Sequence, residues 1–169
     1  MGLRKGQIGR NLSGDGPTGT LDGVRLVPAV PGDLAALCAL DAACFGLEAW
    51  SPGSWREVLT EPGWMVLTAR ADTALAGALV LLPWPPVASL ASVAVAPPWR
   101  RRGLGRRLLL EALHRGRACG ARWLSLEVDA DNADALRLYR REGFRAARRF
   151  VESGRHRLEM LHRLGGPHE

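Results

Sequence analysis

The chain has 169 residues, of which 47% are hydrophobic and 24% are charged, and its formal net charge at pH 7 is +6. These values are typical of one soluble globular domain, and no apolar run reaches the roughly 18–20 residues that a membrane span needs. The three cysteines lack the C-x-x-C spacing of a disulfide framework or a zinc site, so neither is expected.

The positive charge raises nucleic acid as a partner. Lys5 is the only lysine, so the other 22 of the 23 basic residues are arginine. Together with abundant Ala, Gly, Leu and Pro, this bias is typical of a GC-rich genome. The arginines are spread along the chain without interleaved aromatic stacking positions. A nonenzymatic basic module that binds nucleic acid is therefore the minor alternative.

Residues 1–23 are rich in Gly, Ser, Asp and Thr and show no hydrophobic period, so we predict a flexible tail. No apolar segment accompanies Arg4, Lys5 and Arg10, which argues against a secretory signal and favours the cytoplasm of a prokaryote. Residues 24–164 are predicted to form a single domain, followed by a short tail at 165–169.

Hydrophobic periodicity, helix caps and glycine stops predict the elements of this domain in chain order. Helices are predicted at Pro31–Phe45, Ser51–Thr60, Gly103–Cys119 and Asn132–Glu142. Strands are predicted at Val24–Val27, Trp64–Ala69, Leu75–Leu82, Leu90–Ala96, Trp123–Val128, Phe144–Glu152 and His156–Leu164. The order β-α-α-β-β-β-α-β-α-β-β indicates an α/β domain with a mixed sheet.

The stretch 90–107, LASVAVAPPWRRRGLGRR, joins a strand to a helix through a turn that contains two glycines. The first N–H groups of such a helix are unpaired, and with the helix dipole they favour an anion such as a phosphate. Gly103 and Gly105 let the backbone approach a ligand closely, and the preceding arginines add positive charge. The pattern predicts a phosphate site; the alternative is a glycine-rich turn with solvated arginines.

Three features at their observed spacing resemble the GCN5-related N-acetyltransferase (GNAT) superfamily. They are Val95-Ala-Pro with Arg100-x-x-Gly103-x-Gly105, then Leu126-Glu127-Val128, then Asn132-x-x-Ala135-x-x-Leu138-Tyr139 with Gly143-Phe144. Residues 124–139 are similar to the RimI-like branch, the ribosomal-protein alanine N-acetyltransferases, which acetylate protein N-terminal α-amines. The resemblance covers about 24–164. It implies an α/β (α+β) fold with a mixed, mostly antiparallel sheet flanked by helices on both faces.

The resemblance also implies acetyl-CoA as co-substrate, with no metal. In the family, amides of the glycine turn bind the pyrophosphate of coenzyme A, and the backbone of the preceding strand binds the pantetheine arm. Here these cofactor-binding roles fall on Val93, Val95, Arg100, Arg101, Arg102, Gly103, Leu104, Gly105, Arg106 and Asn132. Arg100 stands where the family usually has Gln, and 87–90 lacks the acidic residue often found entering that strand.

Acetyl transfer to an amine requires the ammonium to lose a proton and the leaving thiolate to gain one. The resemblance makes Glu127 the candidate base, directly or through water, and Tyr139 the candidate acid. Taken singly, Glu127 also fits a solvated strand residue, Tyr139 a half-buried core aromatic, and Asn132 a helix N-cap. Asn132, Ala135 and Tyr139 share one helix face.

No cysteine lies in the glycine turn or on the Glu127 strand, so direct attack in a ternary complex is preferred to an acetyl-cysteine route. A free α-amine has a pKa near 7.7–8.0, against about 10.4 for lysine, and is the easier group to deprotonate. We therefore expect an N-acetyltransferase acting on a protein or peptide N-terminus. A small-molecule amine is the alternative acceptor. By resemblance, the segment from Glu48 to Ser51 helps to shape the acceptor site.

Overall fold

The computed structural model describes residues 7–8 and 21–165. Its helices are α1 (Leu34–Phe45), α2 (Pro52–Thr60), α3 (Leu104–Ala118) and α4 (Ala133–Arg141), with 3₁₀ turns at Pro31–Asp33, Gly46–Glu48 and Pro97–Trp99. Its strands are β1 (Gln7–Ile8), β2 (Val24–Pro28), β3 (Met65–Ala71), β4 (Ala74–Leu82), β5 (Val87–Val95), β6 (Trp123–Asp129), β7 (Arg145–Glu152) and β8 (Arg155–Arg163). Within these residues, no helix is long and apolar enough to cross a membrane.

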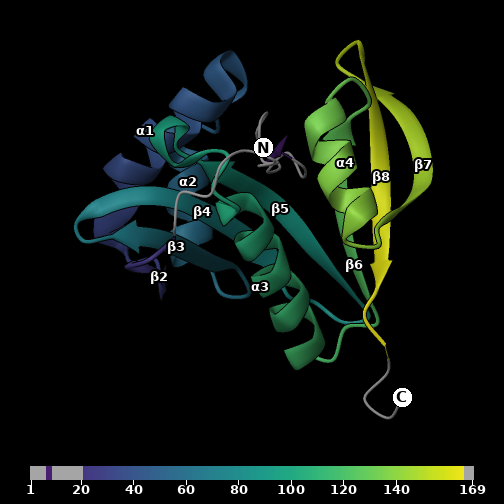
Figure 1. The fold of residues 1–169 in the computed structure, drawn as a ribbon, viewed down its shortest axis with the longest axis horizontal. Helices are drawn as coiled ribbons and strands as arrows, with labels where there is room; N and C mark the ends of the chain where they lie inside the picture. Colours follow the sequence, from purple (N-terminus) through teal and green to yellow (C-terminus); the bar gives the residue numbers. More distant parts are fainter. Residues whose placement is uncertain (1–6, 9–20, 166–169) are drawn as a thin grey trace.

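One mixed sheet runs through the molecule in the order β2-β3-β4-β5-β6-β8-β7, and β1 pairs with β5 off this path. Neighbouring strands are antiparallel except at β5–β6 and β1–β5. Figure 1 shows two groups of strands, β2–β5 and β6–β8, that meet at one end and diverge toward the other. The only direct ladder between the groups in the described residues is β5–β6.

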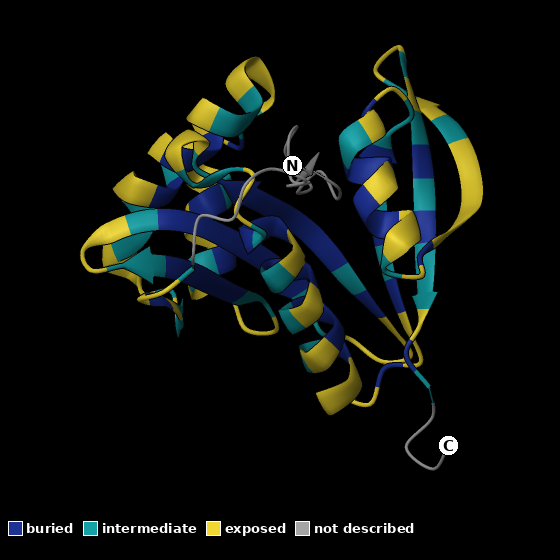
Figure 2. Ribbon diagram, viewed as in Figure 1, coloured by how far each residue is buried: buried dark blue, intermediate teal, exposed yellow. Residues whose placement is uncertain are grey.

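Two buried clusters lie on the two faces of this sheet (Figure 2). Residues of α3 and α4 join one cluster, which includes Leu108, Leu126, Val128 and Tyr139. Residues of α1 and α2 join the other, with Trp55 among them. The predicted mixed sheet with helices on both faces is confirmed.

A bulge in β5 separates the two groups of strands. Val80 pairs with Ser92 and Leu81 with Leu90, so Ala91 has no partner on β4. An extra residue bends its strand and increases the local twist. The β5–β6 ladder ends at the same point, with the pair Leu90–Leu126. Beyond this pair β5 diverges from β6, and residues 91–95 of β5 have no ladder partner on β6.

The predicted order of elements from Val24 onward is confirmed, with shifts at the ends. The stretch Pro31–Asp33, predicted as the start of a helix, is a separate 3₁₀ turn. Strand β5 begins at Val87, three residues before the predicted start at Leu90. Ser51 caps α2 as expected, because its Oγ accepts the Ser54 N–H at 3.1 Å.

Strand β1 was not predicted. It falls within the predicted tail 1–23, most of which lies outside the described residues. Gln7 and Ile8 pair in parallel with Ser92 and Val93, on the part of β5 that has left β6. In Figure 1, β1 lies beside the N label, between the two diverging groups of strands.

Candidate active site

Beyond the pair Leu90–Leu126, β5 and β6 diverge, and we call this separation of the two strands the opening; the predicted site residues lie on the elements beside it. Val93 and Val95 lie on β5 beyond the bulge, and Glu127 lies on β6 one residue beyond the last β5–β6 pair. The Val95 carbonyl accepts hydrogen bonds from Arg100 Nε at 3.0 Å and from the Cys44 thiol at 3.4 Å. At Val93, the ladder partner is Ile8 of β1.

The turn between β5 and α3 has the backbone geometry of an anion seat. Arg101 and Gly103 both have positive φ, 60° and 84°, so the chain reverses sharply just before Leu104. Gly103 is the N-cap and offers no side chain to the first helical N–H groups. The first bond of the helix runs from Arg107 N–H to the Gly103 carbonyl, which leaves the donors of the first turn for another acceptor.

The arginines of this turn point in different directions. Arg100 turns inward, with Nε on the Val95 carbonyl and Nη2 3.5 Å from Cys44 Sγ. Arg102 stacks over the Trp99 ring, 4.9 Å from its centroid. Arg101 and Arg106 are exposed, and Arg106 Nε lies 2.6 Å from Glu142 Oε1 at the end of α4. The structure therefore brings the glycine turn next to the helix that carries Tyr139.

Glu127 is half-buried on the face of β6 opposite to Leu126 and Val128, as the alternation of a strand requires. That is the side of the sheet on which α1 and α2 pack against β3, β4 and β5, because Leu126 and Val128 belong to the cluster of α3 and α4 on the opposite side. Burial raises the pKa of the Glu127 carboxyl; Arg157 opposes this shift, while Glu152 and Glu159 add to it. A carboxylate with a raised pKa is a better proton acceptor.

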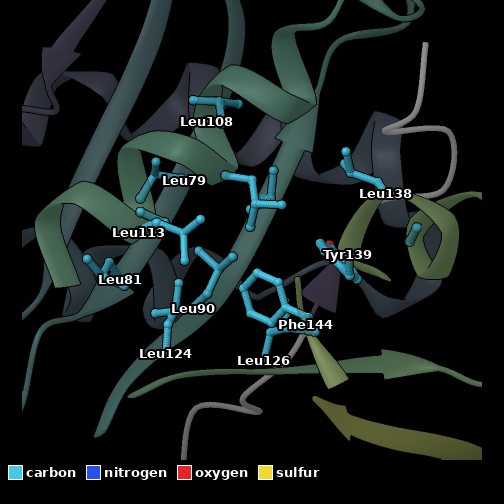
Figure 3. Packing of buried hydrophobic residues seen from close by; sticks show 14 of the residues in the cluster. Leu79, Leu81, Leu90, Leu108, Leu113, Leu124, Leu126, Leu138, Tyr139 and Phe144 are labelled. Atoms are coloured by element: carbon cyan, nitrogen blue, oxygen red, sulfur yellow. The ribbon is translucent and has the colours of Figure 1, made fainter. Parts of the chain in front are cut away.

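Tyr139 lies on the other face of the sheet, fully buried beside Phe144, with ring centroids 5.7 Å apart (Figure 3). Its hydroxyl has no hydrogen-bond partner in the part of the chain that the structure describes. Burial raises the pKa of Tyr139 well above its ordinary value, so the hydroxyl keeps its proton. An unpaired buried hydroxyl is costly unless a ligand engages it, which makes this atom a candidate contact.

Asn132 is the N-cap of α4: its Oδ1 accepts the Ala135 N–H at 3.2 Å, and the residue is 7% exposed. The structural reading of this residue as a cap is confirmed. Its predicted contact with the cofactor stays a prediction.

Sequence reasoning missed a set of ion pairs at the open ends of β5 and β6. Arg155, at the start of β8, pairs with Asp129 at the end of β6 and with Glu48 in the α1–α2 connection. Arg157 pairs with Glu152 at 2.9 Å. The two pairs of Arg155 link segments far apart in sequence, so local spacing carried no signal for them.

Within residues 7–8 and 21–165, no three His, Cys, Asp or Glu residues are grouped so that they could hold a metal ion.

Known proteins resemble this chain in sequence and in fold. The sequence profile described as "Acetyltransferase (GNAT) family" matches residues 34–144. The chain is 38% identical over 116 residues to the N-alpha-acetyltransferase RimI of Mycobacterium tuberculosis, a match covering 65% of this chain and 72% of that protein. It is 46% identical over 59 residues to the mycothiol acetyltransferase of Thermobifida fusca, covering 35% of this chain but only 18% of that protein.

Among solved structures, the ribosomal-protein-S18-alanine N-acetyltransferase of Escherichia coli superposes with a TM-score of 0.76. The superposition covers 86% of this chain and 98% of that one, at 23% sequence identity. At this level of identity the likeness establishes a shared fold.

Proposed function

This chain belongs to the acetyltransferase (GNAT) family, and we propose that it transfers an acetyl group from acetyl-CoA to the N-terminal α-amine of a protein or peptide. Family membership sets aside the nonenzymatic nucleic-acid-binding alternative. The acceptor class is supported by the resemblance to RimI, a named N-alpha-acetyltransferase.

One observation carries the proposal: where β5 and β6 diverge, the two faces of the sheet hold complementary groups. The glycine turn before α3 and the unpaired hydroxyl of Tyr139 belong to the face of α3 and α4. Glu127 belongs to the face of α1 and α2. A cofactor seated on the first face and an amine approaching from the second would meet within the opening.

The residues of the chain fit coenzyme A. Amides from Arg101 to Arg106 would hold the pyrophosphate, because the first turn of α3 leaves N–H donors free and two of its residues are glycine. The β5 edge beyond Ala91 would hold the amide-bearing pantetheine arm as an added strand. Bound there, acetyl-CoA supplies an acetyl thioester.

The chemistry assigned to the protein is proton transfer. Glu127 takes a proton from the attacking ammonium, directly or through one water, so that the nitrogen lone pair can form the new C–N bond. The C–S bond breaks, and the Tyr139 hydroxyl donates a proton to the departing sulfur. The attacking nitrogen still carries one surplus proton after the C–N bond forms, and this proton restores the Tyr139 hydroxyl. The groups act from opposite faces, in keeping with direct attack in a ternary complex.

A panel of acceptors tests the proposal with the full chain. Release of thiol from acetyl-CoA is measured with an alanine-initiated hexapeptide, with the same peptide blocked at its α-amine but containing lysine, and with small-molecule amines. The free peptide is expected to be acetylated fastest. Glu127→Gln and Tyr139→Phe should each lower kcat about 100-fold or more, the usual scale for losing general acid–base catalysis. Calorimetry should still detect the binding of coenzyme A by both variants.

A small-molecule amine is the second candidate acceptor, favoured by the 46% identity to an enzyme named for mycothiol. Faster turnover of a small amine than of the peptide would select it. Wild-type turnover in both variants would remove the assigned roles, and no binding of acetyl-CoA at millimolar concentration would reject the whole function.

A further inference from the structure

Asp41 is a carboxylate buried in the apolar cluster between α1, α2 and the sheet. Its exposed fraction is 0%, and its neighbours in this cluster include Leu37 and Leu40. Oδ2 accepts the backbone N–H of Trp50 at 2.6 Å and the indole Nε1–H of Trp55 at 3.2 Å. Burying a carboxylate costs free energy unless hydrogen bonds compensate for the lost water. The bonds from Trp50 and Trp55 supply this compensation at Oδ2.

Asp41 lies on α1, and the atoms it binds lie at the end of the α1–α2 connection and on α2. Trp50 precedes the N-cap of α2, so the bond to its N–H fixes where the connection ends. The Trp50 and Trp55 rings also contact each other, with centroids 5.2 Å apart. One carboxylate thus ties both tryptophans to α1.

The start of the same connection is tied to β5. Cys44, in the last turn of α1, donates its thiol to the Val95 carbonyl, and Arg100 binds both groups. Gly46 then reverses the chain with φ 56°. The connection is therefore held at its start by the end of β5 and at its end by Asp41.

Between the contacts of Cys44 and Trp50, the connection reaches toward the strands β6–β8. Leu47 is fully exposed, and the Glu48 carboxylate pairs with Arg155, which also binds Asp129 two residues beyond Glu127. The connection lies on the face of the sheet that Glu127 shares. Through Glu48, Arg155 and Asp129 the connection is linked to the end of the strand that carries Glu127, and we take it to line the approach of the amine.

We propose that Asp41 is a positioning residue for the acceptor: through Trp50 and Trp55 it holds residues 46–51 in the shape that the acceptor meets on its way to Glu127. The inference rests on the proposed function for its acceptor, but the tie between Asp41 and the connection is independent of it.

The surroundings of Asp41 favour a role for this residue beyond packing. Burial raises the pKa of Asp41 to about 6, although the hydrogen bonds from Trp50 and Trp55 act against the shift. Asp41 Oδ1 and Trp50 Nε1 are both buried without a partner among the described residues. An apolar residue would fill this space without the unpaired oxygen, so the chain maintains a polar group that packing alone does not need.

Four variants of the full chain separate positioning from folding. Asp41→Leu keeps the branching of the side chain at Cγ and removes both bonds; Asp41→Asn keeps an oxygen for the Trp50 N–H and removes the charge. Asp33→Asn, at the other end of α1, is the matched control, because it weakens a partly buried ion pair with Arg70 that is remote from the connection. Trp55→Phe removes the indole donor but keeps an aromatic ring, and it serves if Asp41→Leu does not fold.

The first measurement is steady-state kinetics with acetyl-CoA and the alanine-initiated hexapeptide, or the best amine of the panel above. We expect Asp41→Leu to raise the acceptor KM at least fivefold with the KM for acetyl-CoA within twofold of wild type. Trp55→Phe should raise the acceptor KM about twofold to fivefold. Asp41→Asn should restore it, and Asp33→Asn should not change it. An unchanged acceptor KM in Asp41→Leu, or equal changes in both KM values, would overturn the proposal.

The second measurement is hydrogen exchange, which does not depend on activity. We expect faster exchange confined to 46–51 in Asp41→Leu, and a Trp50 amide in the wild type that exchanges more slowly than that of exposed Leu47. A Trp50 amide as fast as Leu47 would show that the tie is absent. If the wild type fails to bind acetyl-CoA, the proposed function fails, while exchange still decides whether Asp41 holds the connection.

Discussion

Glu127 and Glu159 lie directly opposite each other on β6 and β8. Residues opposed in an antiparallel pair share a face, and like charges there repel each other. Burial is the first cause of the raised pKa of Glu127, and the negative charge of Glu159 adds to it. Arg148, paired with Glu159 at 3.1 Å, acts in the opposite direction. The basicity of the candidate base is thus set partly by a neighbour that touches no substrate.

Glu159→Gln should shift the acid limb of the pH–rate profile to lower pH. Glu127 must be ionised to accept a proton, so the rate rises as pH passes its pKa. Removing the Glu159 charge lowers that pKa, and freeing Arg148 lowers it further. The measurement is kcat/KM between pH 4.5 and 8 with the best acceptor of the panel.

Glu111→Gln is the control for this shift, because Glu111 pairs with Arg115 on α3 and is not among the groups that shift Glu127. Its profile should coincide with that of the wild type. An acid limb that stays fixed in Glu159→Gln would mean that another group controls the rate.

At the scale of elements, β1 and the proposed pantetheine arm require the same edge. Ile8 is the ladder partner of Val93, and Val93 is also one of the residues predicted to contact the cofactor. One strand edge has one set of N–H and C=O groups, so two extended ligands cannot pair with it together. Binding of the cofactor there requires β1 to leave.

Replacing both Gln7 and Ile8 by proline should therefore tighten the binding of coenzyme A. Proline removes an N–H donor and is poorly tolerated in a ladder. A backbone hydrogen bond contributes about 0.5–1.5 kcal/mol net, and about 1.4 kcal/mol is tenfold in affinity. We expect the Kd from calorimetry to fall about threefold to tenfold.

Prolines at Asn11 and Leu12, outside β1, are the matched control and should leave the Kd unchanged. Equal Kd values for the β1 variant and the wild type would show that β1 does not compete with the cofactor.

The elements that sequence analysis placed well are those with local signals. The start of α2 follows from Ser51 and Pro52, which act within one turn. The turn before α3 follows from Gly103, which accepts a positive φ. In contrast, β1 has two residues and no period, so its pairing depends on an edge that another part of the chain leaves open.

The candidate site divides in the same way. Glu127 and Tyr139 were found by motif, but their positions on opposite faces depend on how β6 and α4 pack. Asp41 follows Leu37 by four residues and so falls on the apolar stripe of α1, a signal that could have indicated a buried carboxylate. Its partners Trp50 and Trp55 lie beyond a turn, and only the folded chain shows the contact.

At the scale of the whole molecule, the two groups of strands are joined by a short ladder and by side chains. The ladder pairs Val87–Leu90 with Trp123–Leu126. Arg106 to Glu142 and Arg155 to Glu48 add ion pairs between the groups. Exposed ion pairs of this kind contribute about 0–1 kcal/mol each, so the relative placement of the groups depends mainly on the ladder and the core.

Coenzyme A should protect both groups of strands at once. At 100 times its Kd, a ligand stabilises the folded state by about 2.7 kcal/mol. Hydrogen exchange is expected to slow at 91–95 and 103–106 in one group and at 127–129 in the other, together with a higher Tm. Protection limited to the first group would contradict a cofactor placed between β5 and β6.

The divergence of β5 from β6 depends on one extra residue in β5, and not on the chemical nature of that residue. Ala91 is the extra residue at the bulge, and its small side chain gives it no evident chemical role. Substitution scanning along β5 would therefore pass over it. Deleting Ala91 would instead bring β4 and β5 into continuous register and remove the bend that turns β5 from β6. The expected product is a closed sheet that has lost the proposed catalytic site.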